Sequence, residues 1–435
     1  MVIALSNLGP VKHMEIDLSK RLIAFMGLNG VGKTYVSYII YSLLRGFYSA
    51  INLLQDSEKI DEDTIKGTLS IDALFSCVNN QIQAVVEQLP QIFNISDDDL
   101  QLKDASISLL TTKEELHQDI LKQEQNFIVT DLFHFQKNAG ELEFMIKKMN
   151  KDEFDKENAN NISLFIMKIL VYGSPTATIL TAERSGIYTF SRELSLNRFK
   201  QSSFAPTAFQ IQRYPMPIVD SLIEADDLVQ IKKQKAPTAD LAARIESDIL
   251  MGKMVISSDG ELRFKTKKME KDIAFSLASS AVKTIAPIIL FLKHKTAHNQ
   301  VLIIDEPELN LHPKNQILLA RIFARMINAN IRLIINTHSD YILRELNSLI
   351  MLNSVDSEIR KKLKYAEDEK IDHLKVGVYE FNMEEATGHG VVVKEVPVSK
   401  TGFDSVLIDE VINKQMNSAQ NIYLALGNLD EQIEN

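Results

Sequence analysis

Short apolar runs that end in polar residues recur along this 435-residue chain, and such runs are typical of buried strands. Residues 22–26 and 301–304 are apolar without interruption, which predicts strands buried in a core. Longer helix-compatible segments, such as residues 35–44, lie between them. This mixture predicts an α/β fold. Further strands are expected at residues 177–182, 331–335, 376–381 and 391–396.

A hairpin pattern precedes the strand at residues 22–26. Residues 2–8 are apolar and alternate loosely, Gly9-Pro10 is a turn signal, and from His13 onward polar and apolar residues alternate. We therefore expect two short strands joined by a turn at the start of the chain.

Residues 46–171 are rich in Gln, Asp, Glu and Lys, contain few glycines, and are mostly helix-compatible. No heptad pattern persists over several heptads, so a long coiled-coil arm is not expected. We interpret this stretch as part of a mainly helical insertion that packs on the core and mediates assembly.

The composition, with 45% hydrophobic and 24% charged residues, is that of a globular chain. Its length suggests several domains or one domain with a large insertion. No apolar run is long enough to span a bilayer, and no membrane partner is expected. Cys77 is the only cysteine, which excludes internal disulfides and suits a reducing cytoplasm, the expected location. The formal net charge of -10 gives no overall footprint for nucleic acid, although a local basic groove stays open.

A glycine-rich loop joins the strand at residues 22–26 to the helix at residues 35–44. The loop, residues 27–34, reads GLNGVGKT and has the G-x-x-x-x-G-K-T spacing of a phosphate-binding loop. Its backbone N–H groups turn inward around phosphates, and the helix N-terminus adds its positive end. Lys33 is expected to reach the β- and γ-phosphates of ATP, and the Thr34 hydroxyl to ligate Mg²⁺. The nucleotide contacts predicted in this region are Asn29, Gly30, Gly32, Lys33, Thr34 and Tyr35.

Two adjacent carboxylates, Asp305 and Glu306, follow the apolar run at residues 301–304. Buried carboxylates at a strand end have little structural rationale, because ionised groups are costly to desolvate unless they meet a metal or a proton transfer. Asp305 is therefore expected to hold Mg²⁺ through water opposite Thr34, and Glu306 to polarise the attacking water.

Three further positions are candidates with simpler alternatives. Arg184 follows the strand at residues 177–182, where ligands bind in open α/β sheets, so it is a candidate phosphate or interface residue; a structural ion pair is the alternative. His338 follows the strand at residues 331–335. Taken alone, this position favours a core histidine whose ring nitrogens are hydrogen-bonded. Ser279-Ser280 precedes a helix-compatible segment, which fits N-capping.

The order of these motifs resembles that of the ABC-type ATPase head domain of the RecF, SMC and OLD kind, and the N-terminal hairpin is similar to the antiparallel sheet of that group. In this resemblance, Ser279-Ser280 matches the signature motif and His338 matches the switch histidine, whose imidazole can hydrogen-bond the γ-phosphate. The matching set is residues 27–34, Ser279-Ser280, Asp305-Glu306, Asn310 and His338.

Three phrases look more narrowly like the stand-alone ATPase subunits of bacterial anti-phage defence systems, PARIS-like with Septu and OLD relatives. They are residues 182–187 (AERSGI), 277–280 (LASS) and 305–313 (DEPELNLHP).

The family resemblance implies that two copies face each other head to tail. ATP bound by Lys33 of one copy would be capped by Ser279 and Ser280 of the other, because their hydroxyls and N–H dipoles would meet the γ-phosphate only across an interface. Relatives usually carry Gly where Ala281 stands. For the glutamine that links nucleotide state to the helical lobe, the alternatives are Gln136 and the glutamines between Gln81 and Gln91.

The expected fold class is therefore α/β, an ABC-type P-loop ATPase head with a mixed sheet, N-terminal antiparallel strands and a large mainly helical insertion. The expected parts are residues 1–50 (N-lobe with the phosphate-binding loop), 51–245 (mainly helical insertion with a core strand near 177–182), 246–350 (C-lobe with the signature, acidic and histidine motifs) and 351–435 (C-terminal α+β extension).

The leading hypothesis is an ATP-hydrolysing homo-oligomer, a head-to-tail dimer or higher, that controls a separate effector in anti-phage defence. The effector would be a toprim-type or other nuclease, and a phage protein would be the trigger. The alternative is a DNA-binding repair or chromosome-maintenance ATPase, which salt-dependent DNA binding would favour. A local groove for DNA would be lined by Lys265, Lys267, Lys268 and Lys271.

Overall fold

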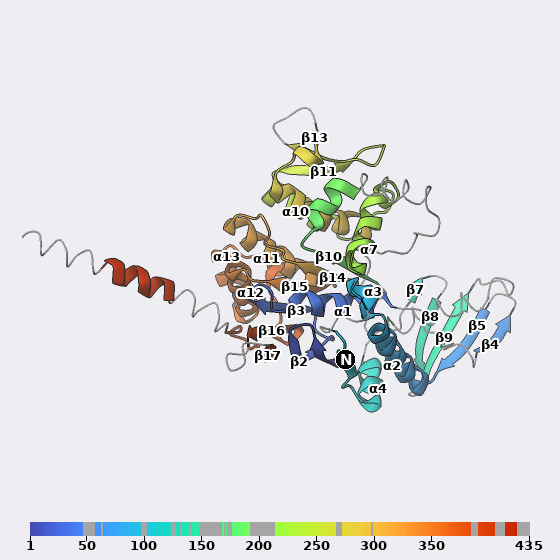
Figure 1. Ribbon diagram of the computed structural model, residues 1–435. Helices are drawn as coiled ribbons and strands as arrows, with labels where there is room; N and C mark the ends of the chain where they lie inside the picture. The colour runs from blue at the N-terminus through green and yellow to red at the C-terminus, as the bar shows by residue number, and fades with distance from the viewer. Residues whose placement is uncertain are drawn as a thin grey trace, which may run out of the picture.

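A nine-stranded mixed sheet forms the centre of the computed structural model (Figure 1). In spatial order its strands are β10 (Ala177–Leu180), β14 (Val301–Asp305), β15 (Arg332–Thr337), β3 (Leu22–Gly27), β16 (Val376–Met383), β17 (Val391–Val396), β2 (Val11–Asp17), β1 (Val2–Leu8) and β6 (Ser106–Leu109). The residues that the structure describes are 1–46, 57–61, 64–96, 102–122, 128–130, 133–138, 141–147, 168, 171, 176–191, 214–266, 272–296, 299–383, 390–404 and 414–423.

The neighbours from β10 through β14, β15 and β3 to β16 all pair in parallel, whereas β1 pairs in antiparallel fashion with β2 and β6. The predicted N-terminal hairpin is thus confirmed, and so are the predicted strands around the phosphate-binding loop and the acidic pair. Because the five parallel strands run the same way, the residues that follow them meet at one edge of the sheet.

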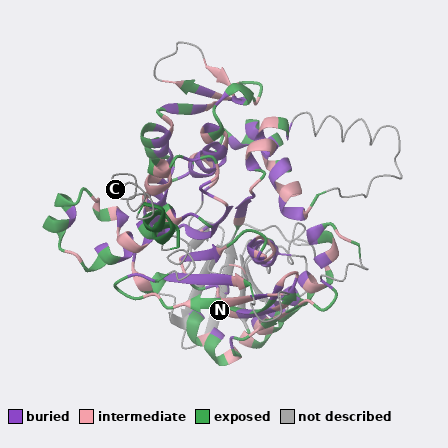
Figure 2. Cartoon of the chain, turned by 60° about the vertical axis from the view of Figure 1, so that its left-hand side comes forward, coloured by how far each residue is buried: buried purple, intermediate pink, exposed green. Residues whose placement is uncertain are grey.

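Helices cover both faces of this sheet because successive side chains of β3 point to opposite sides. Ile23 and Phe25 pack with α1 (Lys33–Arg45) and α2 (Ile71–Glu87), whereas Ala24 and Met26 pack with helices on the other face. The buried strands stand out in the centre of Figure 2. The helices on the second face are α10 (Ser280–Leu290), α11 (Pro313–Asn328) and α12 (Asp340–Met351).

The two ends of helix α1 contact different parts of the molecule. Its first residues belong to the phosphate-binding loop, and near its last turn Tyr41 Oη donates a hydrogen bond to Asp220 Oδ2 at 2.9 Å. The Arg45 guanidinium forms an ion pair with the same carboxylate, with Nε 2.7 Å from Oδ2. Asp220 lies in α7 (Met216–Asp226), so α1 is tied to a helix of the insertion.

The predicted C-terminal α+β part, residues 351–435, contributes two strands to the central sheet, β16 and β17. Strand β16 lies in the central sheet between β3 and β17, and Val376, Val378 and Phe381 are buried. The local pattern predicts this strand correctly, but strand order depends on pairing between distant segments, which a local pattern does not contain.

The prediction of a mainly helical insertion is wrong for part of residues 51–245. Helix α2 is confirmed, but a second sheet stands beside the central one in Figure 1. In β9 charged and apolar residues alternate with the period of a strand, a signal that the charged composition of the region obscured. In spatial order the second sheet contains β4 (Ser57–Asp61), β5 (Thr64–Leu69), β9 (Glu141–Lys147), β8 (Phe133–Asn138) and β7 (Ile128–Thr130).

The remaining elements lie around these two sheets. Among the described residues, no helix is long and apolar enough to cross a bilayer. A third sheet contains β11 (Gly252–Ile256), β12 (Leu262–Thr266) and β13 (Ile273–Ala274). Further α-helices are α3 (Leu89–Phe93), α4 (Lys113–Lys122), α8 (Leu228–Ile231), α9 (Ala239–Ile245) and α13 (Ser357–Lys362). Short π and 3₁₀ helices are η3 (Glu246–Leu250), η4 (Phe275–Leu277), η5 (Phe291–Lys295), η6 (Leu352–Ser354), η7 (Glu367–Glu369) and η8 (His373–Lys375).

Phe381→Ala tests the importance of β16 for the sheet. Phe381 is fully buried and its ring lies edge-on to Phe25, with centroids 5.6 Å apart. We expect the substitution to lower the free energy of unfolding by about 3–5 kcal/mol in urea titrations, because it leaves a cavity beside the loop strand. Met383→Ala, at an exposed position of the same strand, should change it by less than about 0.5 kcal/mol. Equal losses in the two variants would contradict a structural role for β16.

Candidate nucleotide-binding site

The phosphate-binding loop is held between the N-terminal hairpin and β16, at positions that only glycine can occupy. Gly32 has a φ of 92°, and a Cβ there would lie 2.8 Å from Pro10 Cγ. Gly27 has a φ of 144°, and a Cβ there would lie 2.6 Å from the carbonyl oxygen of Phe381. Both the backbone conformation and the close approach of neighbours therefore require glycine.

Lys33 lies against its own loop and is almost completely buried. Its Nζ donates hydrogen bonds to the carbonyl oxygens of Gly27, at 2.9 Å, and Leu28, at 2.6 Å. Burial lowers the pKa of Lys33, while the carboxylates of Asp305 and Glu306 act in the opposite direction. A phosphate bound in this loop would thus meet an ammonium group that is already desolvated, where charge interactions are stronger than in water.

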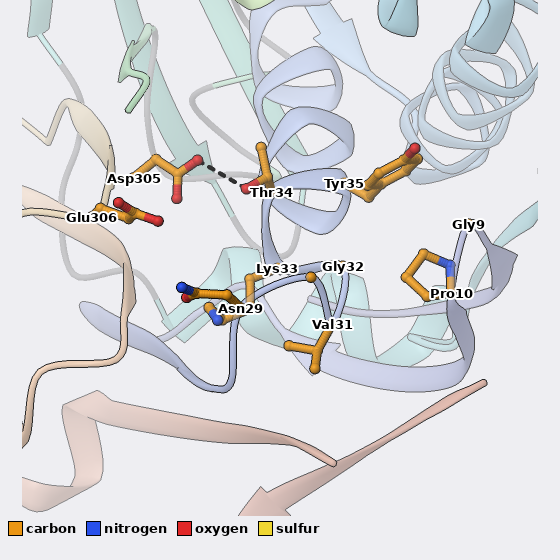
Figure 3. Close-up of a pocket in the computed structure, with 11 residues that line it drawn as sticks. Gly9, Pro10, Asn29, Val31, Gly32, Lys33, Thr34, Tyr35, Asp305 and Glu306 are labelled. Carbon is orange, nitrogen blue, oxygen red and sulfur yellow. Dashed lines mark hydrogen bonds between the residues drawn. The ribbon is translucent and has the colours of Figure 1, made fainter. Parts of the chain in front are cut away.

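A chain of hydrogen bonds joins α1 to the ends of β14 and β15. Thr34 Oγ1 donates to Asp305 Oδ2 at 2.9 Å, the bond drawn in Figure 3. Asn336 Nδ2 donates to the other oxygen of the same carboxylate at 3.0 Å, and Ser37 Oγ donates to Asn336 Oδ1 at 2.8 Å. A hydroxyl and a carboxylate oxygen in contact are the hard donors that Mg²⁺ prefers, so this pair fits the predicted metal.

The loop and the acidic pair face one cavity of about 550 Å³ (Figure 3). This volume lies within the usual range for small-molecule sites. Sequence reasoning treated Gly9 and Pro10 only as a turn, yet they line the cavity beside Tyr35, whose ring stacks on Phe93. The cavity is lined by Gly9, Pro10, Asn29, Gly30, Val31, Gly32, Lys33, Thr34, Tyr35, Asp305 and Glu306.

Glu306 lines the cavity in an unusual backbone conformation, with a φ of 47°. Its main-chain N–H donates to the carbonyl oxygen of Asn336 at 3.0 Å, which fixes the turn after β14. A non-glycine residue with positive φ is strained, and such strain is concentrated at functional sites.

The predicted phosphate or interface contact of Arg184 is not what the structure contains. Its side chain is only 1% exposed, and its guanidinium donates to main-chain carbonyl oxygens, two of which belong to Asp305 and Glu306. Burial lowers the pKa of Arg184 to about 10, so the group stays protonated at neutral pH. The sequence placed Arg184 at a strand end but did not indicate its contact with the backbone of the acidic pair, because residue types alone do not reveal such a contact.

Sequence reasoning assigned no role to Glu308, which holds the turn that carries His338. The buried Glu308 carboxylate accepts hydrogen bonds from Thr337 Oγ1 and from the His338 main-chain N–H, both at 2.9 Å. The imidazole Nδ1 of His338 lies 3.4 Å from Glu308 Oε1. A signal was present, because Glu308 is a third carboxylate in the same short stretch as the predicted pair. His338 itself is exposed and does not line the cavity.

The two serines of the predicted signature motif are exposed and do not line the cavity of their own copy. Ser279 caps α10, because its hydroxyl accepts a hydrogen bond from the Val282 N–H. The N-capping interpretation is thus confirmed for Ser279, while the contact with a second copy stays a prediction. Leu277, just before them, is 79% exposed. Of the alternatives for the linking glutamine, Gln81 is buried in α2 and does not line the cavity, and Gln136 lies in β8.

A glycine loop that opens a helix, with a lysine, a threonine and an acidic strand end around one cavity, defines a P-loop ATPase. The chain belongs to the AAA ATPase domain family (AAA_15), whose profile matches residues 1–343. A comparison with curated protein sequences finds no match.

Comparison with solved structures finds a distant likeness to SMC head domains, at 11% sequence identity in each case. The SMC head bound to the C-winged helix domain of ScpA has a TM-score of 0.38 and covers 92% of this chain and 98% of its own. The SMC head domain from Thermotoga maritima has a TM-score of 0.35, with coverages of 91% and 98%. The SMC head with an extended coiled coil, bound to the C-terminal domain of ScpA derived from Pyrococcus furiosus, has a TM-score of 0.35, with coverages of 97% and 98%.

Asp305→Asn should raise the melting temperature at neutral pH, in the absence of nucleotide and Mg²⁺. Burial raises the pKa of Asp305, an effect that hydrogen bonds from Asn336 and Thr34 only partly oppose. The ionised carboxylate therefore costs stability above its folded pKa and costs none below its unfolded pKa. An amide keeps both contacts, since its oxygen can accept from Asn336 and its nitrogen can donate to Thr34.

The gain should shrink as the pH falls and vanish below about 4, the ordinary pKa of aspartate, because the carboxyl group is then protonated in both states. Melting temperature measured against pH in EDTA tests this expectation, with Asp404→Asn at an exposed position as the matched control. A loss of stability in Asp305→Asn at neutral pH would contradict the proposed desolvation cost.

Proposed function

We propose that this protein is an ABC-type ATPase that binds and hydrolyses ATP with Mg²⁺ and associates head to tail with a second copy. The observation that carries the proposal is the 2.9 Å hydrogen bond from Thr34 to Asp305, with Lys33 and Glu306 at the same cavity. It supports the proposal because a metal ligated by this pair would lie where the β- and γ-phosphates of ATP reach Lys33.

The chain's own residues divide the hydrolytic task between them. The loop N–H groups and Lys33 bind and orient the phosphates, and Thr34 and Asp305 would hold Mg²⁺, which supplies charge neutralisation at the phosphate oxygens when bound. Glu306 accepts a proton from a water molecule as its oxygen attacks the γ-phosphorus. The bond from the γ-phosphorus to the bridging oxygen then breaks, and ADP and phosphate leave.

His338 would complete the site from the end of β15. Glu308 holds its main chain and lies near Nδ1. Nε2 is therefore the ring nitrogen that would donate to the γ-phosphate. A neutral or protonated imidazole can donate a hydrogen bond to a phosphate oxygen, and charge-assisted bonds of this type are strong.

The exposed start of α10 supports the head-to-tail arrangement. Ser279 and Ser280 are accessible to another molecule, and the N–H groups of the first helical turn have no partner within the helix. A helix N-terminus is a favourable place for an anion, so a γ-phosphate from a second copy would be stabilised there. Leu277 would then be buried in the same interface.

Glu306→Gln should lower the rate of ATP hydrolysis by about 10²–10⁴-fold while ATP binding is retained, because the amide cannot accept the proton. The variant should accumulate as an ATP-bound dimer in sedimentation experiments. Glu395→Gln, at an exposed position of β17, should behave like the wild type. Full activity of Glu306→Gln together with unchanged oligomerisation would refute the proposal.

The same variant provides the background for testing the interface. Adding Leu277→Glu should prevent dimer formation, because a charge would be buried where an apolar side chain fits. The matched control is Leu374→Glu, whose side chain is 68% exposed just before β16. If the Leu277→Glu variant still dimerised with ATP, α10 would not face the second copy.

We further propose that the ATP-bound oligomer controls a separate effector, a toprim-type or other nuclease, in bacterial anti-phage defence, with a phage protein as trigger. The support is the resemblance of three sequence phrases, residues 182–187, 277–280 and 305–313, to ATPase subunits of such systems.

Cells that carry the native locus should lose protection against a phage panel when Lys33 is replaced by Ala, and plaque counts should rise to those of cells without the locus. Unchanged plating together with increased sensitivity to DNA damage would instead favour the DNA-repair alternative. DNA-stimulated, salt-sensitive hydrolysis would point the same way.

A further inference from the structure

The guanidinium group of Arg184 donates hydrogen bonds to main-chain carbonyl oxygens of three segments. Nε donates to the Thr284 carbonyl oxygen at 3.1 Å, and Nη1 donates to that of Thr181 at 3.1 Å. Nη1 also donates to the carbonyl oxygen of Asp305 at 2.6 Å, and Nη2 donates to that of Glu306 at 2.7 Å. The carbonyls belong to the end of β10, the end of β14 and helix α10.

Burying this cation costs free energy, because the guanidinium loses its hydration and gains only neutral carbonyl dipoles in return. A cost of this kind suggests that the residue has a specific role. The nearest carboxylates, Asp305 among them, favour the charged form of Arg184 but do not outweigh its desolvation. What the group achieves is geometric, since a planar guanidinium with five donors can fix several acceptors at once.

The two carbonyls of Asp305 and Glu306 follow one another at the point where the backbone turns into the left-handed region. The Glu306 N–H is held from the other side by the Asn336 carbonyl oxygen of β15. The main chain of Glu306 is therefore held at both its N–H and its C=O, so Arg184 and β15 together fix the point from which its side chain leaves the backbone. These hydrogen bonds also stabilise the positive φ of Glu306, a strained conformation for a residue other than glycine.

The hydrogen bond to Thr284 connects Arg184 to helix α10, which starts at Ser280. The Thr284 carbonyl accepts from Arg184, and the Thr284 hydroxyl accepts from Asn310 Nδ2 at 3.3 Å. Asn310 also has a positive φ, of 59°, and lies just after the acidic stretch. Helix α10 is thus joined to Arg184 and to Asn310 by two hydrogen bonds, both at Thr284, about one turn from its start.

We propose that Arg184 is a positioning residue that holds the Glu306 main chain in place for hydrolysis and fixes it relative to α10. A displacement of α10 by the second copy is then transmitted through the guanidinium to Glu306, which ties hydrolysis to dimer formation. The inference rests on the ATP hydrolysis proposed above and adds a residue that does not touch the nucleotide.

Arg184→Lys tests the inference with the charge and most of the volume retained. A single ammonium has donors at one point only and cannot span carbonyls of three segments. We expect ATP turnover to fall by about 100-fold, the effect of a misplacement of about 1 Å at a reacting group. The ATP dissociation constant should stay within about threefold of the wild type, since Arg184 does not line the cavity.

Arg332→Lys is the matched control. Arg332 is also buried, but it lies at the opposite end of β15 from the site, roughly 16 Å along the strand. Its replacement should leave turnover within about twofold of the wild type even if the melting temperature falls. Wild-type turnover in Arg184→Lys, or equal losses in the two lysine variants, would overturn the positioning role.

Chemical rescue separates positioning from a merely structural role. In Arg184→Ala, millimolar guanidinium should enter the vacated space and raise turnover by about tenfold or more, whereas Glu306→Gln should show no recovery. Absence of rescue in a folded Arg184→Ala protein would count against the inference. If that variant does not fold, Arg184→Lys decides the question alone. Absence of hydrolysis in the wild type would refute the proposed function, whereas an active wild type with an equally active Arg184→Lys would refute only this inference.

Discussion

The hydrogen bond between Thr34 and Asp305 joins residues 271 positions apart in the sequence, and the site depends on it. It forms because β14, β15 and β3 are neighbours in parallel register, with Asp305 opposite Asn336 and Asn336 opposite Phe25. That pairing brings the acidic strand end to the same edge as the phosphate-binding loop. The hairpin and β16 then fix the loop from two sides, at Gly32 and Gly27.

The same edge concentrates charge that the fold would otherwise avoid. Asp305, Glu308, Lys33 and Arg184 are all buried there, and burial shifts the pKa of Asp305 upwards and the pKa values of Lys33 and Arg184 downwards. Neutralisation by a bound ligand relieves such costs, so the ligand-free fold gives up stability for a prepared site. The strained backbone of Glu306 is part of the same cost.

Local pattern and spacing predicted the features that lie within one continuous segment. The phosphate-binding loop, the strands on either side of the acidic pair and the cap at Ser279 are of this type, since each depends on neighbours a few residues away. The place of β16 in the sheet, the cavity-lining role of Pro10 and the carbonyl contacts of Arg184 depend on segments that meet only after folding. The second sheet was missed for a different reason, because charged residues on its strands resemble those of a solvated helix.

Helix α1 has mechanical consequences for the insertion. It contains 13 residues, so its axis is roughly 20 Å long, and an α-helix of this length behaves as a stiff rod. Its first residues belong to the phosphate-binding loop, and near its other end Tyr41 forms a hydrogen bond and Arg45 an ion pair with Asp220. A tilt of a few degrees at the loop would therefore become a displacement of the ångström scale where α1 meets α7.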